Sequence, residues 1–275
     1  MIKDIVVNLG VHGHDTPAAD YAISIASALE AHITGLAIAH DPTLPASGMG
    51  YFSVQLVDQR YDNEAAAKAV IDRFAAAAAR ANVSAETRLL SASSTDAGDQ
   101  FGRIARRFDL AIVSQVDPEG SAIEATMPVS ALFESGRPVI IVPYIQKGLL
   151  KLGRVMVCWD GSRPAARAIG DAMPLLERAG NIEIAIIDNE RGKQEEIKGV
   201  DMGRHLARHG LKVEVSRILR ADNDVADTLL SHSADFGADF VVMGGYGHSR
   251  LREFVLGGVT RRVLRSMTVP TLMSH

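Results

Sequence analysis

The stretch Asp239-Phe240-Val241-Val242-Met243-Gly244-Gly245-Tyr246-Gly247 is an apolar run that ends in clustered glycines. A second cluster, Gly257-Gly258-Val259-Thr260, follows shortly after it, so the glycines read G-x2-G-x9-G. Glycine amides are not shielded by a Cβ atom, and they can therefore form a concave nest for an anion. Amides at the start of a following helix would supply a second set of donors. A buried strand followed by this pattern predicts an α/β fold with a nucleotide site.

The same apolar pattern occurs twice along the chain. Asp109-Leu110-Ala111-Ile112-Val113 resembles the run that begins at Asp239, and Ile5-Val6-Val7 resembles Val155-Met156-Val157. The sequence Pro-Ala-Ala follows each of the latter two runs, at Pro17 and at Pro164. A repeat of about half the chain length predicts two copies of one domain.

Short β-branched runs alternate with longer helical patterns in both copies, which predicts βαβ units and a parallel sheet covered on both faces. The expected strands lie near 4–9, 33–39, 85–91, 109–114, 138–143, 154–159, 182–187, 212–218, 239–243 and 270–274. The expected helices lie near 16–31, 60–81, 95–107, 123–135, 163–179, 193–209, 223–236 and 258–267. The prolines and glycines of residues 41–50 predict an irregular loop after the second strand.

The predicted architecture is α/β, with two tandem Rossmann-like or flavodoxin-like domains. Each is expected to hold a five-stranded, mostly parallel sheet with helices on both faces. We place the domains at residues 1–146 and 151–275, joined by a short linker.

The composition bounds the possible partners. The chain has 275 residues, 47% of them hydrophobic, and a formal charge of -4. An acidic chain with 5% aromatic residues argues against nucleic-acid binding. The first residues lack the layout of a signal peptide, and no apolar stretch approaches the length of a membrane helix. We expect a cytoplasmic protein that does not bind membranes, and a single cysteine, Cys158, that packs as a small buried hydrophobe.

Two strand ends of the second copy carry the candidate site. The first expected strand ends in Trp159-Asp160-Gly161-Ser162, and the fourth ends in the glycine cluster. Ligands of open parallel sheets bind beyond the carboxyl ends of the strands. Asp160 would then face the glycines and either accept ribose hydroxyls or hold a divalent ion against phosphates. The alternative is that Asp160 only caps the following helix.

An aspartate followed by G-x2-G-x9-G resembles the universal stress protein family, and the likeness extends over the whole chain as two tandem domains. The implied fold is similar to that of the adenine nucleotide alpha hydrolases, and the resemblance implies ATP binding, with or without Mg²⁺, in the second domain only. It also implies that the final strands, 138–143 and 270–274, pair near a pseudo-two-fold axis, so that one chain imitates a homodimer. The cofactor-binding residues implied by the resemblance and its neighbouring positions are Asp160, Gly161, Ser162, Ile187, Met243, Gly244, Gly247, His248, Arg250, Gly257, Gly258, Val259 and Thr260.

The chain departs from the family pattern at Gly258, where the pattern has Ser or Thr. The nearest hydroxyl comes two residues later, at Thr260, so one side-chain donor to phosphate is missing. The departure lowers the expected affinity for phosphate.

The first copy lacks the glycine motif and the aspartate of the second copy. Without gaps, Gly244 and Gly247 correspond to Ser114 and Asp117, while Gly257 and Gly258 correspond to Met127 and Pro128. Asp117 and Glu119 would place negative charge against phosphates, Pro128 lacks an amide, and Gly10 stands at the place of Asp160. We predict that this half binds no nucleotide.

Other candidate residues carry weaker signals. Arg252, like His248 and Arg250, could pair with phosphate oxygens, and His12 with His14 lacks the further ligands that a metal site needs. Neither copy holds a paired nucleophile and base or a P-loop, so no catalytic residue and no metal site are predicted.

We therefore expect a stress-response protein that binds ATP in its second domain and uses occupancy as a switch. The alternative is a structural or interaction module of the same fold that binds no nucleotide. The third hypothesis is an enzyme, either a slow ATPase or one that acts on a small ligand. The sequence names no protein partner beyond a homodimer.

Overall fold

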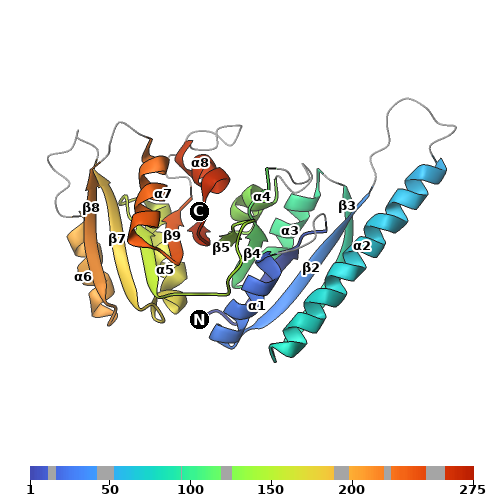
Figure 1. Ribbon diagram of the computed structural model, residues 1–275, viewed down its shortest axis with the longest axis horizontal. Coiled ribbons are helices and arrows are strands. Elements are labelled where there is room, and N and C mark those ends of the chain that lie inside the picture. The colour runs from blue at the N-terminus through green and yellow to red at the C-terminus, as the bar shows by residue number, and fades with distance from the viewer. Residues whose placement is uncertain are drawn as a thin grey trace. The chain divides into compact units, whose positions relative to one another are not determined.

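A computed structural model of the chain describes residues 1–11, 17–41, 53–93, 95–118, 126–188, 198–219, 224–245 and 258–275. The chain forms two compact units, Ile2–Arg137 and Pro138–His275, and Met1 goes with the second. Each unit is an α/β structure in which strands and helices alternate along the chain (Figure 1).

The first unit contains a parallel sheet. Its elements are β1 (Asp4–Leu9), α1 (Pro17–Leu29), β2 (His32–Asp41), α2 (Ser53–Arg80), β3 (Ala85–Ser93), α3 (Ala97–Ala105), β4 (Leu110–Ser114) and α4 (Met127–Glu134). The strand order is β3-β2-β1-β4, and each neighbouring pair is parallel. The chain therefore adds strands on one side of β1 and then crosses to the other, as in doubly wound folds.

The second unit repeats this order and adds two strands, β10 and β5. Its elements are β5 (Val139–Val142), β6 (Arg154–Cys158), α5 (Arg163–Leu176), β7 (Asn181–Asp188), α6 (Lys198–Arg208), β8 (Val213–Leu219), α7 (Val225–Phe236), β9 (Phe240–Gly244), α8 (Gly258–Ser266) and β10 (Thr271–Ser274). The strand order is β8-β7-β6-β9-β10-β5. Only the β5–β10 pair in this unit is antiparallel.

Helices cover both faces of the second sheet. Gly199 and Gly203 of α6 approach Ile186 and Ile184 of β7, whereas His232 of α7 bonds to Glu183, which points to the opposite face. Gly244 of β9 packs closely against the backbone of α5, on the face of the sheet away from α7 and α8. The sheet is therefore a middle layer, with α5 and α6 on one face and α7 and α8 on the other.

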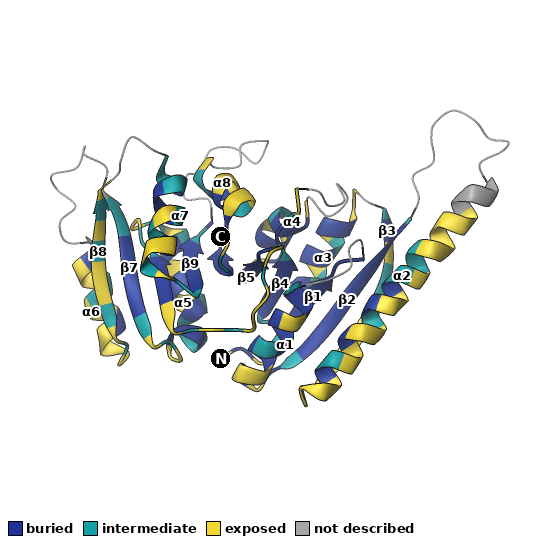
Figure 2. Cartoon of the chain, in the orientation of Figure 1, coloured by how far each residue is buried: buried dark blue, intermediate teal, exposed yellow. Residues whose placement is uncertain are grey.

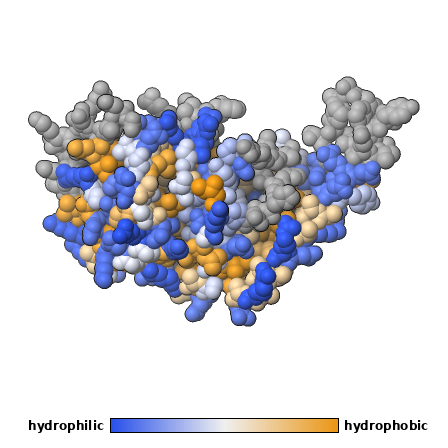
Figure 3. Space-filling view, in the orientation of Figure 1, coloured by the Kyte–Doolittle hydropathy of each residue, from blue (hydrophilic) through white to orange (hydrophobic). Residues whose placement is uncertain are grey.

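The central strands are buried on both faces, as the continuous apolar runs predicted. Val155, Val157 and Val242 have no exposed surface, and the same holds for Ile5, Val6 and Val7 of β1. Figure 2 shows these strands in dark blue between helices with exposed outer faces. On the surface seen in Figure 3, apolar residues lie in small groups among hydrophilic ones. No described helix combines the length and the apolar character needed to cross a membrane.

The repeated aspartates explain why the two copies share a pattern. The Asp239 carboxylate accepts a hydrogen bond from the Arg154 amide at 2.9 Å, and the Asp239 amide donates to the Arg154 carbonyl at 2.8 Å. In the first unit, the Asp109 carboxylate accepts from the amides of Lys3 and Asp4 at 2.8 and 3.1 Å. Each aspartate therefore joins the starts of two neighbouring parallel strands, β6 with β9 and β1 with β4.

The predicted α/β fold is confirmed, and two details differ from the expectation. Helix α2 begins at Ser53 instead of near residue 60, because helix-forming residues precede the apolar face that signalled it. Strand β5 pairs with β10, as predicted, with Ile140 opposite Leu272. This pairing places β5 in the second compact unit, so the two units hold four and six strands instead of five each.

Replacing Asp239 by alanine should lower the free energy of unfolding by roughly 1 kcal/mol, because the Arg154 amide loses a charged acceptor. Urea denaturation measures this change. Asp201→Ala, which removes an exposed ion pair with Arg204 on α6, is the control and should stay within about 0.5 kcal/mol of the wild type. Equal effects of the two substitutions would contradict a structural role for the repeated aspartate.

Candidate functional site

The second unit has a switch point between β6 and β9. The chain leaves β6 through α5 toward β7, while β9 pairs with the opposite side of β6. Loops that leave two such strands diverge and open a crevice at their carboxyl ends. The loop Asp160-Gly161-Ser162 leaves β6 at this edge, and Gly244-Gly245 ends β9 beside it.

The loop after β6 has a defined hydrogen-bonded shape. The Asp160 carboxylate accepts a hydrogen bond from the Ser162 amide at 2.9 Å, which forms an Asx turn. Gly161 has φ +76°, a conformation that a residue with a side chain rarely adopts. Ser162 then caps α5, since its Oγ accepts from the Ala165 amide at 3.2 Å. The helix cap is therefore Ser162, and Asp160 keeps an exposed carboxylate at the edge of the sheet.

Gly244 permits α5 to begin against the end of β9. A Cβ atom at this position would lie 2.5 Å from the Ala165 amide nitrogen and 2.7 Å from the Pro164 carbonyl carbon. Both are backbone atoms, so they cannot move aside as a flexible side chain would. Close packing of strand and helix is thus one reason for this glycine, whether or not a phosphate also approaches it.

The end of β9 is tied to its neighbours. The Gly245 amide donates to the Ser274 carbonyl at 2.8 Å, and the Gly245 carbonyl lies 3.1 Å from His275 Nδ1. The buried Ser274 hydroxyl donates to Asp171 of α5 at 2.8 Å, and Arg167 of the same helix donates to the His275 backbone oxygen at 3.0 Å. Strand β10 and helix α5 therefore hold the first residues of the glycine motif in place. This network could not be predicted from the sequence, because its members lie far apart along the chain.

Helix α8 begins at Gly258, the position where the chain departs from the family pattern. Gly258 is exposed, and among the described residues no atom outside its chain neighbours and its own helix lies within 4 Å of the place where its Cβ atom would stand. Val259 is half-buried, whereas Thr260 is only 4% exposed. The Thr260 hydroxyl therefore lies inside the fold and is poorly placed to replace the missing hydroxyl at Gly258.

The structure gives the remaining predicted residues different settings. Ile187 is half-buried near the end of β7, where it pairs with Ile218 of β8. Met243 is buried under α7 and α8. The predictions for Gly247, His248, Arg250 and Gly257 fall outside the described residues.

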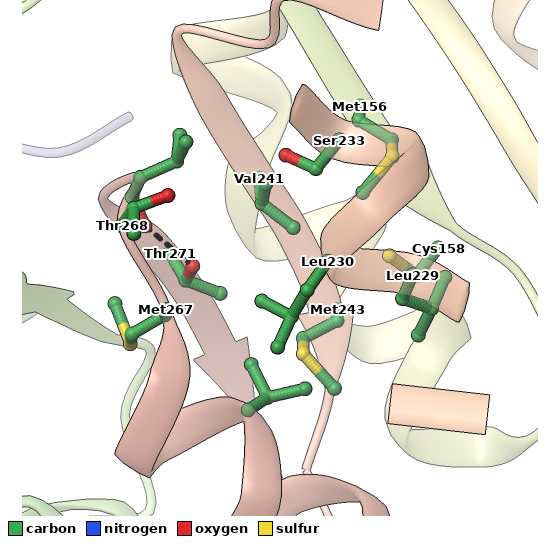
Figure 4. Close-up of a pocket in the computed structure, with 12 residues that line it drawn as sticks. Met156, Cys158, Leu229, Leu230, Ser233, Val241, Met243, Met267, Thr268 and Thr271 are labelled. Atoms are coloured by element: carbon green, nitrogen blue, oxygen red, sulfur yellow. Dashed lines mark hydrogen bonds between the residues drawn. The ribbon is translucent and has the colours of Figure 1, made fainter. Parts of the chain in front are cut away.

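A cavity of about 20 Å³ lies under the candidate site, between the sheet and helices α7 and α8 (Figure 4). Sulfur-bearing side chains gather around it, together with the Ser233 hydroxyl: Met156, Cys158, Met243 and Met267. The volume suits a single water molecule and is far too small for a nucleotide. A larger cavity of about 230 Å³ involves Gln146, Lys151 and Asp239 at the opposite, amino ends of β9 and β10. Neither cavity coincides with the edge that carries Asp160.

Burial raises the pKa of the Cys158 thiol to about 12, with further contributions from the Asp160 and Glu183 carboxylates. The residue retains some exposed surface overall, but a thiol with this pKa is neutral at physiological pH. Cys158 therefore behaves as the predicted small hydrophobe and not as a nucleophile.

The geometry defines a class of protein with two doubly wound α/β units in tandem. In the second unit, the Asp160 turn lies beside the strand that ends in glycines. The family model described as "Universal stress protein family" matches residues 151–275. Residues 151–275 are therefore a domain of the universal stress protein family.

Two relatives illustrate the extent of the similarity. A universal stress protein of Synechocystis sp. is 23% identical over 139 residues, which are 50% of this chain and 46% of that protein, so the match spans about half of its length. The crystal structure of a universal stress protein from Archaeoglobus fulgidus shares 16% identity and covers 98% of this chain and 97% of that one, with a TM-score of 0.74. The tandem arrangement is therefore a known form of this fold.

Solved relatives with bound nucleotide each match about half of the chain. One is a universal stress protein in complex with cAMP, 18% identical, covering 52% of this chain and 97% of that one with a TM-score of 0.37. Another, from Arabidopsis thaliana with AMP bound, is 16% identical and covers 51% and 91%, with a TM-score of 0.35. Each of these two relatives binds an adenine nucleotide.

Substituting Gly244 by alanine should destabilise the protein by roughly 2 kcal/mol, because the new methyl group meets the backbone of α5. Gly258→Ala is the matched control, since its methyl group would enter open space and alanine favours a helix; it should be neutral or slightly stabilising. Thermal and urea unfolding of both variants measure the difference. Equal stability of the two would contradict the packing role of Gly244.

Cys158 should react slowly with a thiol reagent at pH 8 in the folded protein, because a thiol with a pKa of about 12 holds very little thiolate there. The same reagent should label the urea-unfolded chain at the rate of a free cysteine. The reaction is followed by absorbance, and fast labelling of the native protein would show that the thiol is exposed and ionised.

Proposed function

We propose that the second unit binds ATP at the carboxyl edge of β6 and β9, and that occupancy of this site acts as a stress-response switch. The observation that carries the proposal is the Asp160 turn, which holds an exposed carboxylate beside the glycine-ended strand β9. Family membership and the adenine nucleotides bound by relatives support the same ligand class.

The described residues fit an adenine nucleotide in most respects. A carboxylate repels phosphate directly, so Asp160 suits either the ribose hydroxyls or a Mg²⁺ ion that bridges to the phosphates. The exposed start of α8 offers backbone amides without a side chain over them at Gly258. Ser162 contributes less, because its hydroxyl already accepts a hydrogen bond as the cap of α5.

The first unit is proposed to be silent toward nucleotides. Gly10 follows its first strand in place of an aspartate, and Asp117 is an exposed negative charge where the second unit has a glycine. Pro128 occupies the first turn of α4, which removes one of the amides that α8 offers.

A second candidate function is an interaction module of the same fold that binds no nucleotide. One feature favours it: the hydroxyl missing at Gly258 is not replaced by Thr260, which is buried. Slow ATP hydrolysis ranks below both, because the described part of the edge offers no residue placed to act as a general base.

Replacing Asp160 by asparagine should weaken ATP binding about tenfold, because the charge is lost while the Asx turn keeps an acceptor. Asp160→Ala removes the turn as well and should weaken binding further. Isothermal titration with and without Mg²⁺ measures the dissociation constant. If the Asp160→Asn effect disappears without Mg²⁺, the carboxylate acts through the ion; if it persists, the carboxylate contacts ribose. Unchanged affinity in both variants would remove Asp160 from the site.

Gly258→Ser should strengthen ATP binding by roughly threefold to tenfold, because the described residues leave room for the side chain and its hydroxyl adds one phosphate contact. Gly258→Ala adds a methyl group without a hydroxyl and serves as the control. The same titration measures both variants. If wild type and Gly258→Ser both release no heat with ATP, the interaction-module function takes precedence.

A further inference from the structure

The second unit contains an ion pair with two parallel hydrogen bonds between its last two helices. Arg262 of α8 donates through Nε and through Nη2 to the two carboxylate oxygens of Asp227, each at 2.8 Å. Asp227 lies in the first turn of α7. This bidentate arrangement fixes the orientation as well as the distance of the two groups, which a single contact would not do.

Helix α8 has little buried surface of its own. It has nine residues, of which only Thr260 and Val263 are buried. A small buried surface gives little resistance to rolling or sliding of a short helix. The helix also carries three arginines and no acidic residue, so no ion pair within α8 can hold these side chains.

We propose that the Asp227–Arg262 pair is a latch that sets the position of the amino-terminal amides of α8 toward the phosphates of a bound nucleotide. The inference rests on the proposed function, because α8 begins at Gly258 in the glycine motif. It assigns Asp227 and Arg262 as positioning residues, neither of which belongs to the family motif. The latch acts on phosphate recognition and not on the adenosine part of the ligand, which the ends of β6 and β7 would meet.

A competing role for Arg262 predicts the opposite result. If Arg262 were itself a phosphate ligand, Asp227 would compete with phosphate for its guanidinium group. Asp227→Asn would then free Arg262 and tighten ATP binding. Under the latch, the same substitution loosens α8 and weakens ATP binding, so the sign of one change separates the two roles.

The test is isothermal titration of the full chain with ATP and with adenosine. Asp227→Asn and Arg262→Gln should each weaken ATP binding roughly fivefold and leave adenosine binding within about twofold. Arg262→Lys keeps the charge but loses the planar fork, and it should fall between wild type and Arg262→Gln. The double variant Asp227→Arg with Arg262→Asp should recover most of the lost affinity. Asp201→Asn, on the exposed pair of α6, is the control and should bind ATP as the wild type does.

Amide hydrogen exchange of the ligand-free protein tests the latch independently of nucleotide. Exchange within 258–266 should rise about fivefold in Asp227→Asn, while β9 and β10 remain unchanged. If the wild type binds ATP and Asp227→Asn binds it equally well or more tightly, the latch is wrong and the proposed function stands. If the wild type binds no adenine nucleotide, the proposed function fails, and the phosphate role of the latch fails with it. Unchanged exchange in α8 would overturn the latch in either case.

Discussion

The contact between Gly244 and the first turn of α5 is the constraint on which the candidate site depends. The backbone of Pro164 and Ala165 occupies the space that any side chain at residue 244 would need. Because α5 can start there, its cap Ser162 and the Asx turn of Asp160 lie beside the end of β9. The carboxylate and the glycine-ended strand thus share one edge as a consequence of packing. A ligand would find this geometry already formed in the described residues.

The duplicated architecture separates what the fold requires from what the ligand requires. Asp109 and Asp239 have the same role in both units, since each joins the starts of two neighbouring strands. By contrast, the residues at the carboxyl edges differ, with an aspartate turn in the second unit and Gly10 in the first. A feature that both copies retain is explained by stability, whereas a feature found in one copy points to binding. The proposed ATP site rests on this second kind of feature.

Strand positions and the strand-end location of Asp160 could be predicted from the sequence, because buried parallel strands leave continuous apolar runs. The reason for Gly244 could not be predicted in full, since a packing glycine and a phosphate-binding glycine look identical in a sequence. The burial of Thr260 could not be predicted either, because it depends on how α8 packs in the folded unit. Likewise, the membership of β5 in the second unit follows from its antiparallel ladder with β10, a contact between segments more than a hundred residues apart.

The proposal of one nucleotide site, in the second unit, is tested most directly by counting the ligands that the chain binds. Native mass spectrometry of the full chain, titrated with ATP and Mg²⁺, counts the bound ligands directly. Saturation at one ATP per chain is expected, with the bound population lost in Asp160→Ala. Two ATP molecules per chain would contradict the silent first unit, and none at any concentration would contradict the site itself.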